Sequence, residues 1–476
     1  MKKIISLILA LVMVMGLAVG ASAKTVGIEG ENKASITISN ASKGVTYKVY
    51  KLFNATVTGE ENGSISYTGE IPEKLNDYFT KDSAGNISLK EDASEKDLFD
   101  ALATWAGSAE ATAEAESDGS ELSFVGLDYG YYVVTTTQGE AAITVTSTNP
   151  NAEIVDKNTT AVSNLKKEVN DDDVNFGDTV TYTVSFNTSN YQGAGEDATK
   201  ITAYTITDNP PEFLSEVEVT EIKVDDDEIT LQQFDDDNKI TIAWVDEKGD
   251  SLYANGAVVT ITYTATITES AAIAGAGNTN TVTLNWTGDT TGLTDTATVK
   301  TYAFALKKVD QAGEDLAGAT FQLPFYVKKD TDGTYNYAGN EAGEGLVNTI
   351  TTPDDGVIVV KGVATGNYSI TETAAPAGYN KLTAAVNVTV EESDASKTEY
   401  TTYLNKDGNV VDEEAEEGAT VEYTNEDLAA TVVVVVNKTG SALPSTGGIG
   451  TTLFYVIGGL LMTGAAVLLI TKKRMA

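Results

Sequence analysis

The chain has 476 residues, with 31 basic and 70 acidic side chains and neither histidine nor cysteine. Its length is enough for about three domains, and its net charge of −39 argues against nucleic acid or an anionic membrane surface as a partner. Without histidine or cysteine it cannot build a Ser-His catalytic pair, a thiol nucleophile, a thiolate zinc site or a disulfide.

Residues 1–23 have the organisation of a secretory signal peptide. Lys2 and Lys3 form a positive n-region, Ile4–Val19 is an apolar run, and residues 21–23 form a small-residue cleavage site. A membrane anchor is the alternative interpretation. Cleavage after this segment predicts a secreted protein.

The region between the two ends is rich in alternating Thr, Val, Ile and Tyr, with Gly, Asp and Asn at the turns. This pattern is typical of β-sandwiches. The strongest strand patterns lie at 179–186, 258–267 and 280–286. One helix is expected over 95–107, where Leu98, Leu102 and Trp105 share a face.

We therefore predict an all-β protein of three tandem immunoglobulin-like β-sandwich domains, flanked by the signal peptide and a C-terminal transmembrane helix. The expected domains are an N-terminal domain over 24–157, a middle domain over 158–302 and a C-terminal domain over 303–440.

Acidic runs at 171–173, 225–227 and 235–237 raise the question of calcium. The stretch 329–337 begins with a D-x-D-G pattern but lacks the rest of an EF-hand loop. A solvated hairpin turn is the preferred interpretation of this stretch, and we expect no metal site and no cofactor.

The C-terminal domain places an acid on a buried strand face. In the stretch 366–380, strand alternation puts Glu372 on the apolar face. Lys308 shares a face with apolar residues of its own strand, and so does Asn437 at the end of a valine-rich strand. An amine, an acid and an amide are therefore expected together in one apolar core, where isolated charges are costly.

This combination predicts a reaction. Burial lowers the pKa of a lysine and raises that of a carboxylic acid, so both groups can be neutral. Lys308 Nζ would attack the Asn437 carboxamide, with Glu372 as the acid that polarises it and ammonia as the product. The product is an intramolecular isopeptide bond. A satisfied ion-pair network without chemistry is the alternative, and Asn425 is an alternative partner for Lys308.

The middle domain repeats the arrangement with Lys167, Asp208 and Asn280, each on an apolar strand face. We therefore expect Lys167 and Asn280 to join, with Asp208 as the catalytic acid. The first domain has Thr136 at the position of the glutamate and no inward lysine at its start, so no such bond is expected there.

The C-terminal end reads LPSTGG at 443–448, then an apolar run over 453–470 and three cations over 472–474. Eighteen residues of helix reach about 27 Å, just enough for a bilayer, and the cations stay on the cytoplasmic side. Alone this is a tail anchor. With LPxTG upstream, 443–476 resembles a Gram-positive cell-wall sorting signal, which implies cleavage by a sortase between Thr446 and Gly447.

In that resemblance the sortase recognition and cleavage residues are Leu443, Pro444, Thr446 and Gly447. The sortase holds the acyl group of Thr446 as a thioester and passes it to an amine. Membrane anchoring by the sorting helix is therefore transient.

Several stretches resemble Gram-positive major pilins. YSITETAAPAGY resembles the pilin E-box, and LKKVDQAGEDLAGATFQL at 306–323 resembles the start of a collagen-adhesin (Cna) B-type domain, also called prealbumin-like. The stretches at 44–55, 176–184 and 206–214 resemble the other pilin domains. The resemblance implies autocatalytic isopeptide bonds at both clusters and covalent polymerisation by a pilin sortase.

In such pilins the polymerising lysine usually lies in a YPKN-like motif at the end of the first domain. The corresponding stretch here is EIVDKN, at 153–158, which gives Lys157, with Val155 and Asp156 in place of Tyr-Pro. An ordinary linker lysine is the alternative interpretation of Lys157.

The predicted function is that of a shaft subunit of a covalent pilus on the wall of a Gram-positive bacterium, and not that of an enzyme with turnover. The alternatives are a monomeric wall-anchored adhesin and an ancillary tip or base pilin, while a hydrolase is disfavoured. Expected partners are a sortase, other copies of the chain and peptidoglycan, with ancillary pilins or host ligands as further candidates.

Overall fold

The computed structural model describes residues 24–440, apart from gaps at 32, 59–63, 92, 138–139, 147–148, 158–160, 194–197, 290, 393–398 and 426–429. The predicted signal peptide and the predicted sorting signal at 443–476 lie outside the described residues. Within the part that is described, no helix is both long and apolar enough to cross a bilayer.

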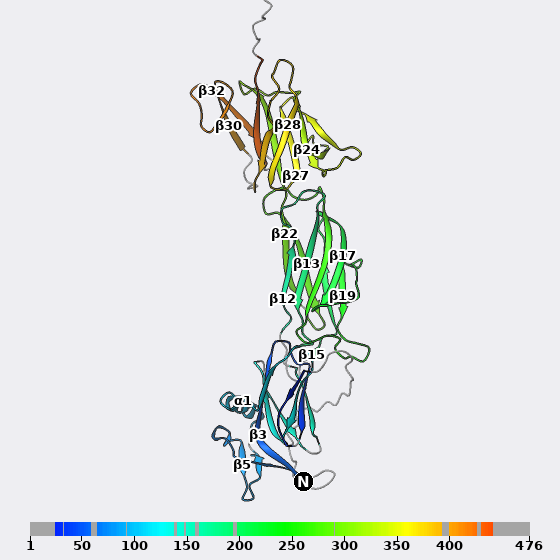
Figure 1. Ribbon diagram of the computed structural model, residues 1–476, viewed down its shortest axis with the longest axis vertical. Coiled ribbons are helices and arrows are strands. Elements are labelled where there is room, and N and C mark those ends of the chain that lie inside the picture. The colour runs from blue at the N-terminus through cyan, green and yellow to red at the C-terminus, as the bar shows by residue number, and fades with distance from the viewer. Residues whose placement is uncertain are drawn as a thin grey trace, which may run out of the picture. The chain divides into compact units, whose positions relative to one another are not determined.

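Two compact units make up the chain. The first contains residues up to Ala272 together with Gly277–Lys300, and the second contains Ile273–Ala276 together with the chain from Thr301 onward. The first unit thus holds residues of both the N-terminal and the middle predicted domains, and the division into three domains stays a prediction. The described chain is almost entirely β, which confirms the predicted fold class (Figure 1).

Two sheets form the N-terminal part of the first unit. One has the order β1 (Lys24–Gly27), β8 (Leu122–Leu127), β2 (Ala34–Ser39) and β11 (Asn151–Val155). The other has the order β10 (Glu140–Val145), β9 (Gly130–Thr135), β3 (Thr46–Thr58), β4 (Ser64–Thr68), β6 (Ile87–Leu89) and β5 (Phe79–Lys81), with β7 (Ala113–Glu116) paired to β3. A single 3₁₀ turn, η1, covers Glu73–Leu75 among the described residues.

The predicted helix is present as α1 (Glu95–Ala106), labelled in Figure 1. Leu98 and Leu102 are buried in an apolar cluster with residues of β3 and β9, as their spacing predicts. Ser94 is the N-cap, and its side chain accepts a hydrogen bond from the Asp97 amide. The cap satisfies one of the amides that the first turn of a helix leaves without a partner.

We expect Ser94→Ala to lower the free energy of unfolding by about 1 kcal/mol, because the capping hydrogen bond is lost. Thr104→Ala in the same helix is the matched control. Its hydroxyl donates to the Asp100 carbonyl, a contact that adds little to helix stability. Urea unfolding followed by circular dichroism measures both variants, and equal stabilities would contradict the assignment of Ser94 as an energetically important cap.

The remaining part of the first unit contains two further sheets, of five and four strands, and a short two-stranded pair. One has the order β12 (Ser163–Val169), β13 (Thr179–Asn187), β20 (Val258–Ile267), β17 (Leu214–Val224) and β18 (Asp227–Glu228). The other has the order β19 (Lys239–Ala243), β16 (Ala203–Asp208), β21 (Asn278–Trp286) and β22 (Leu293–Val299), and a short pair joins β14 (Tyr191–Gln192) to β15 (Thr199–Lys200).

Alternation determines which residues of these sheets face inward. Every second side chain of β13 and β20 is buried, while its neighbours are half-buried or exposed. Tyr182 and Tyr263 consequently lie in the core, where their rings stack with centroids 5.2 Å apart. The strand predictions at 179–186, 258–267 and 280–286 are confirmed by β13, β20 and β21.

The second unit is built on an eight-stranded sheet. Its order is β29 (Val386–Val390), β28 (Gly366–Ala374), β24 (Thr320–Lys329), β25 (Tyr335–Tyr337), β27 (Val357–Val363), β23 (Tyr302–Asp310) and β33 (Thr431–Asn437), with β26 (Val347–Thr351) paired to β24. A smaller sheet has the order β31 (Val410–Val411), β30 (Glu399–Asn405) and β32 (Gly418–Thr424). β28 and β24, both labelled in Figure 1, pair antiparallel within this sheet.

The first and last strands of the second unit are direct neighbours. β23 and β33 pair in parallel, and the register places Lys308 opposite Val435 and Asp310 opposite Asn437. Both faces of β23 are covered, because the main apolar core lies on one side and smaller clusters lie on the other. Strands buried on both faces tend to have nearly continuous apolar sequences, and residues 302–306 of β23 follow this rule.

Candidate functional site

The structure brings together the three residues predicted in the C-terminal part of the chain. Lys308 lies on β23, Glu372 on β28 and Asn437 on β33, and their exposed fractions are 0%, 1% and 0%. Strand alternation predicts these inward orientations, and the structure bears them out. Three polar groups that are normally exposed are therefore enclosed within one core.

The acid of this cluster contacts the amide directly. Asn437 Nδ2 donates a hydrogen bond of 2.8 Å to Glu372 Oε1, and the Leu382 amide donates one of 2.7 Å to Glu372 Oε2. Lys308 Nζ donates to the Val435 carbonyl at 3.1 Å. The amine therefore contacts the backbone of β33 two residues before Asn437.

Burial has a clear effect on the amine. It lowers the pKa of Lys308 to about 8, although the nearby Glu372 and Asp310 carboxylates act in the opposite direction. With that pKa, roughly one amine in ten is neutral at pH 7, compared with one in several thousand for an ordinary lysine. A neutral amine is a nucleophile, so Lys308 is suited to attack a carbonyl carbon.

The Asn437 side chain has a second polar atom besides Nδ2. Its Oδ1 atom is buried and has no hydrogen-bond partner among the described residues. Asn425, the alternative partner, is half-buried and its amide donates to the Tyr423 hydroxyl at 3.2 Å. Asn437 is therefore the asparagine that the fold joins to Glu372.

The second predicted cluster is also assembled. Lys167 lies on β12, Asp208 on β16 and Asn280 on β21, with exposed fractions of 3%, 1% and 0%. Lys167 Nζ and Asp208 Oδ2 form an ion pair at 2.5 Å. Burial lowers the pKa of Lys167, and the charge and hydrogen bond of Asp208 oppose that shift.

One member of this cluster was missed by the sequence analysis. The Tyr263 hydroxyl donates to Asp208 Oδ2 at 2.5 Å and accepts from Asn280 Nδ2 at 2.9 Å. It thereby lies between the acid and the amide. The available signal was the inward position of Tyr263 on a regular strand, because a buried tyrosine hydroxyl normally needs a hydrogen-bond partner.

Aromatic rings surround the buried amine. Lys167 Nζ lies 5.1 Å from the ring centroid of Tyr182 and 5.5 Å from that of Tyr263. The ring faces stabilise the cation within this apolar core. Asn280 Oδ1, like its counterpart in the other cluster, is buried without a hydrogen-bond partner among the described residues.

The predicted polymerisation residue, Lys157, lies two residues after the end of β11 and is half-buried. Asp156, which precedes it, is buried and accepts a hydrogen bond from the Tyr47 hydroxyl. The Asp156 carbonyl accepts another from Asn40 Nδ2 at 2.7 Å. Hydrogen bonds to the side chain and to the carbonyl of Asp156 therefore fix the backbone next to Lys157. The sortase residues near Thr446 lie outside the described residues.

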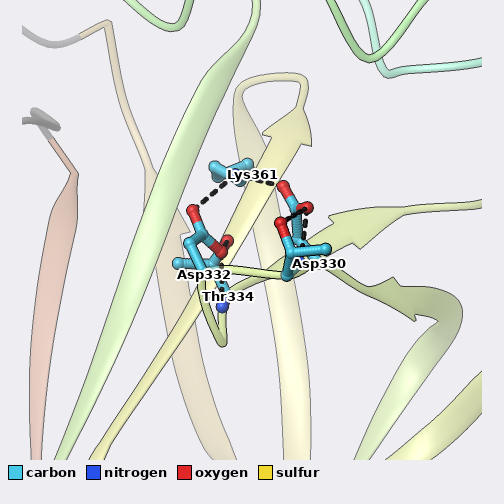
Figure 2. A network of polar contacts seen from close by, with 5 residues as sticks. Asp330, Asp332, Thr334 and Lys361 are labelled. Carbon is cyan, nitrogen blue, oxygen red and sulfur yellow. Dashed lines mark hydrogen bonds and ion pairs between the residues drawn. The ribbon is translucent and has the colours of Figure 1, made fainter.

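The acidic stretch at 329–337 forms a hairpin turn between β24 and β25, as preferred in the sequence analysis. Lys361 Nζ lies 3.0 Å from Asp330 Oδ2 and 3.3 Å from Asp332 Oδ2, and Figure 2 shows it between the two carboxylates. The hydrogen bond from Lys361 lowers the pKa of Asp330, and that from Thr334 lowers the pKa of Asp332. A lysine from β27 thus pairs with both carboxylates of this turn. Among the described residues, no group of three acidic side chains is arranged to hold a metal ion.

Comparison with protein families gives two matches. A model described as a prealbumin-like fold domain matches residues 302–406, and one described as the LPXTG cell wall anchor motif matches residues 435–476. The chain carries a prealbumin-like domain and a cell-wall anchor. The anchor motif implies a sortase substrate attached to the wall of a Gram-positive bacterium.

The prealbumin-like domain contains Lys308 and Glu372, while Asn437 falls within the range matched by the anchor motif. The last three residues of β33 therefore lie in the same matched segment as the sorting motif. Only six positions separate Asn437 from Leu443, the first residue of that motif.

Among curated proteins, the trypsin-resistant surface T6 protein of Streptococcus pyogenes is 31% identical over 223 residues. The match covers 38% of this chain and 38% of that protein. The chain therefore spans well under half the length of this relative.

Solved structures of pilins are also similar. The backbone protein of the group B streptococcus pilus 2b is 23% identical with a TM-score of 0.42, covering 59% of this chain and 99% of that chain. The major pilin SpaD of Corynebacterium diphtheriae is 20% identical with a TM-score of 0.38, covering 86% of this chain and 98% of that chain.

Proposed function

We propose that this protein is the shaft subunit of a covalently polymerised pilus, stabilised by isopeptide bonds from Lys167 to Asn280 and from Lys308 to Asn437. The observation that carries the proposal is the pair of buried clusters, each with an amine, an acid and an amide from well-separated strands. Together with the cell-wall anchor, they describe a surface protein built to be joined covalently, both internally and to other chains.

The reaction at Lys308 is a balanced amide exchange. The ammonium passes a proton to the Glu372 carboxylate, and the neutral Nζ then attacks Cγ of Asn437. Glu372 returns its proton to Nδ2, to which it is already hydrogen-bonded at 2.8 Å, so the C–N bond breaks and ammonia leaves. Nζ then loses a second proton, which goes to Glu372, so the glutamate ends protonated beside the new amide. General acid–base help of this kind needs a positioned acid at hydrogen-bond distance.

The same chemistry at Lys167 uses Asp208 as the acid. Each bond forms only once. The protein is therefore a single-turnover catalyst of its own cross-linking and not an enzyme with an external substrate. Formation of the amide also removes two charges from the core, and burying charges that are not well compensated is costly.

Between subunits, the proposal uses the sorting motif of one chain and an amine of another. A sortase cleaves after Thr446 and transfers its acyl group to Lys157 of the next subunit, and the final subunit is joined to peptidoglycan. Under this proposal, the regions 24–157, 158–302 and 303–440 are the three domains of the shaft subunit. Ancillary pilins and host ligands are further candidate partners.

Intact mass of the purified 24–446 segment should be about 34 Da below the sequence mass, since each bond releases one ammonia of about 17 Da. Lys308→Arg should show a deficit of only about 17 Da, because the guanidinium stays charged and cannot attack. Lys307→Arg, at the neighbouring position on β23, is the matched control and should keep the full deficit. A wild-type mass equal to the sequence mass would refute the cross-links.

The shaft role is tested by immunoblots of cell-wall extracts from cells that carry the cognate sortase. A shaft subunit gives a ladder of covalent multimers that survives boiling in detergent. A single wall-linked band would instead indicate a monomeric surface protein, and would overturn the shaft role without affecting the mass experiment.

A further inference from the structure

We propose that Tyr263 is a catalytic residue for the bond between Lys167 and Asn280, passing a proton from Asp208 to the leaving nitrogen of Asn280. This inference rests on the proposed isopeptide bond. It adds a fourth group to the cluster and a role that neither the lysine nor the acid can fill.

The acids of the two clusters differ in the length of their side chains. In the prealbumin-like domain, Glu372 touches the Asn437 amide nitrogen directly at 2.8 Å. In the other cluster the acid is Asp208, whose side chain is one methylene shorter. The Tyr263 hydroxyl lies between Asp208 Oδ2 and Asn280 Nδ2, at 2.5 Å and 2.9 Å. The Tyr263 hydroxyl therefore connects Asp208 to the Asn280 amide, whereas the longer Glu372 reaches the Asn437 amide without an intermediate group.

Tyr263 is held firmly in this position. Its side chain is fully buried, its ring stacks on Tyr182, and Phe234 packs edge-on against it with centroids 5.5 Å apart. Burial and the neighbouring Asp208 raise the pKa of the Tyr263 phenol. The hydroxyl thus remains protonated in the resting cluster and can relay a proton only by receiving another at the same time.

The relay balances in atoms and charge. Lys167 gives one proton to Asp208, and the neutral Nζ bonds to Cγ of Asn280. The Tyr263 hydroxyl donates its proton to Nδ2 and takes the proton held by Asp208, so the bond from Cγ to Nδ2 breaks and ammonia leaves. The second proton of Nζ then returns to Asp208. The products are the new amide, ammonia, a protonated Asp208 and an unchanged Tyr263.

Tyr263→Phe is the direct test, and Tyr182→Phe is a closely matched control. Both tyrosines are buried in the same stacked pair, but the Tyr182 hydroxyl has no hydrogen-bond partner among the described residues. Each substitution removes one hydroxyl and keeps the ring. The bond between Lys308 and Asn437 in the same chain serves as an internal control.

The 24–446 segment is synthesised in a cell-free system and sampled over time by peptide mapping with mass spectrometry. We expect Tyr263→Phe to slow formation of the bond from Lys167 to Asn280 by about 10²–10⁴-fold, the range of general acid–base catalysis. Tyr182→Phe should react at the wild-type rate, and the Lys308 bond should form normally in both. Limited proteolysis of the same samples reports whether the middle region has folded.

A folded Tyr263→Phe chain that forms the Lys167 bond as fast as Tyr182→Phe overturns the inference. If the wild type lacks this bond, the proposed cross-link itself fails, which is a different result. Adding Asp208→Glu to Tyr263→Phe supplies the missing methylene and should restore much of the rate. A double variant as slow as Tyr263→Phe would refute the argument from reach.

Discussion

Glu372→Gln is expected to abolish the bond between Lys308 and Asn437 and to lower the free energy of unfolding of the second unit by about 4–5 kcal/mol. That estimate is for a cross-link closing a loop of about 130 residues, treated as a disulfide would be. The variant keeps the size of the side chain at position 372. It removes the proton transfer, because a carboxamide can neither take a proton from Lys308 nor pass one to Asn437.

Glu391→Gln is the matched control, since Glu391 is exposed just beyond β29 and should change neither mass nor stability. Thermal or denaturant unfolding with proteolysis of the second unit measures the stability, and peptide mapping measures the bond. A Glu372→Gln protein that still shows the Lys308 cross-link would remove the glutamate from the mechanism. One that loses the bond but keeps its stability would refute the cross-link as a source of stability.

Lys157→Ala is expected to abolish the multimer ladder, leaving only the wall-linked monomer. The reason is that the substitution removes the proposed acceptor amine and leaves the sorting motif intact. Immunoblots of wall extracts measure the loss, which should exceed tenfold in the amount of dimer and larger species. The internal cross-links should form normally, so the mass deficit of about 34 Da should persist.

Lys166→Ala provides the control, because Lys166 is an exposed lysine on the nearby strand β12 that pairs with the surface residue Glu168. Its ladder should equal that of the wild type. An unchanged ladder in Lys157→Ala would assign polymerisation to another lysine and would leave the sortase and anchor parts of the proposal standing.

Much of the two clusters could be predicted from sequence because strand periodicity is simple. Side chains alternate between two faces, so an ionisable residue in phase with apolar neighbours points inward. That rule places Glu372 and Asp208 in the core, as the structure confirms. The helix at 95–107 was equally accessible, since three apolar residues at helical spacing define its buried face.

The role of Tyr263 could not be read in the same way. Its phase predicts burial, but a buried tyrosine in a strand usually serves as core, and its hydroxyl can reach in several directions. That the hydroxyl meets both Asp208 and Asn280 depends on how β20 faces strands of the other sheet, which no local pattern specifies. The identity of the asparagine beside Lys308, Asn437 or Asn425, likewise depends on which strand pairs with β23. The structure pairs β23 with β33, which carries Asn437.

The parallel pairing of β23 with β33 determines how a pulling force is shared. Tension that enters at Tyr302 and leaves beyond Asn437 draws two parallel strands in opposite directions along their own axes. The backbone hydrogen bonds between them are then loaded in shear, all at once, and not peeled apart one after another. This geometry resists extension even before any covalent link is considered, and the smaller sheet against β23 and β33 keeps water from competing for those bonds.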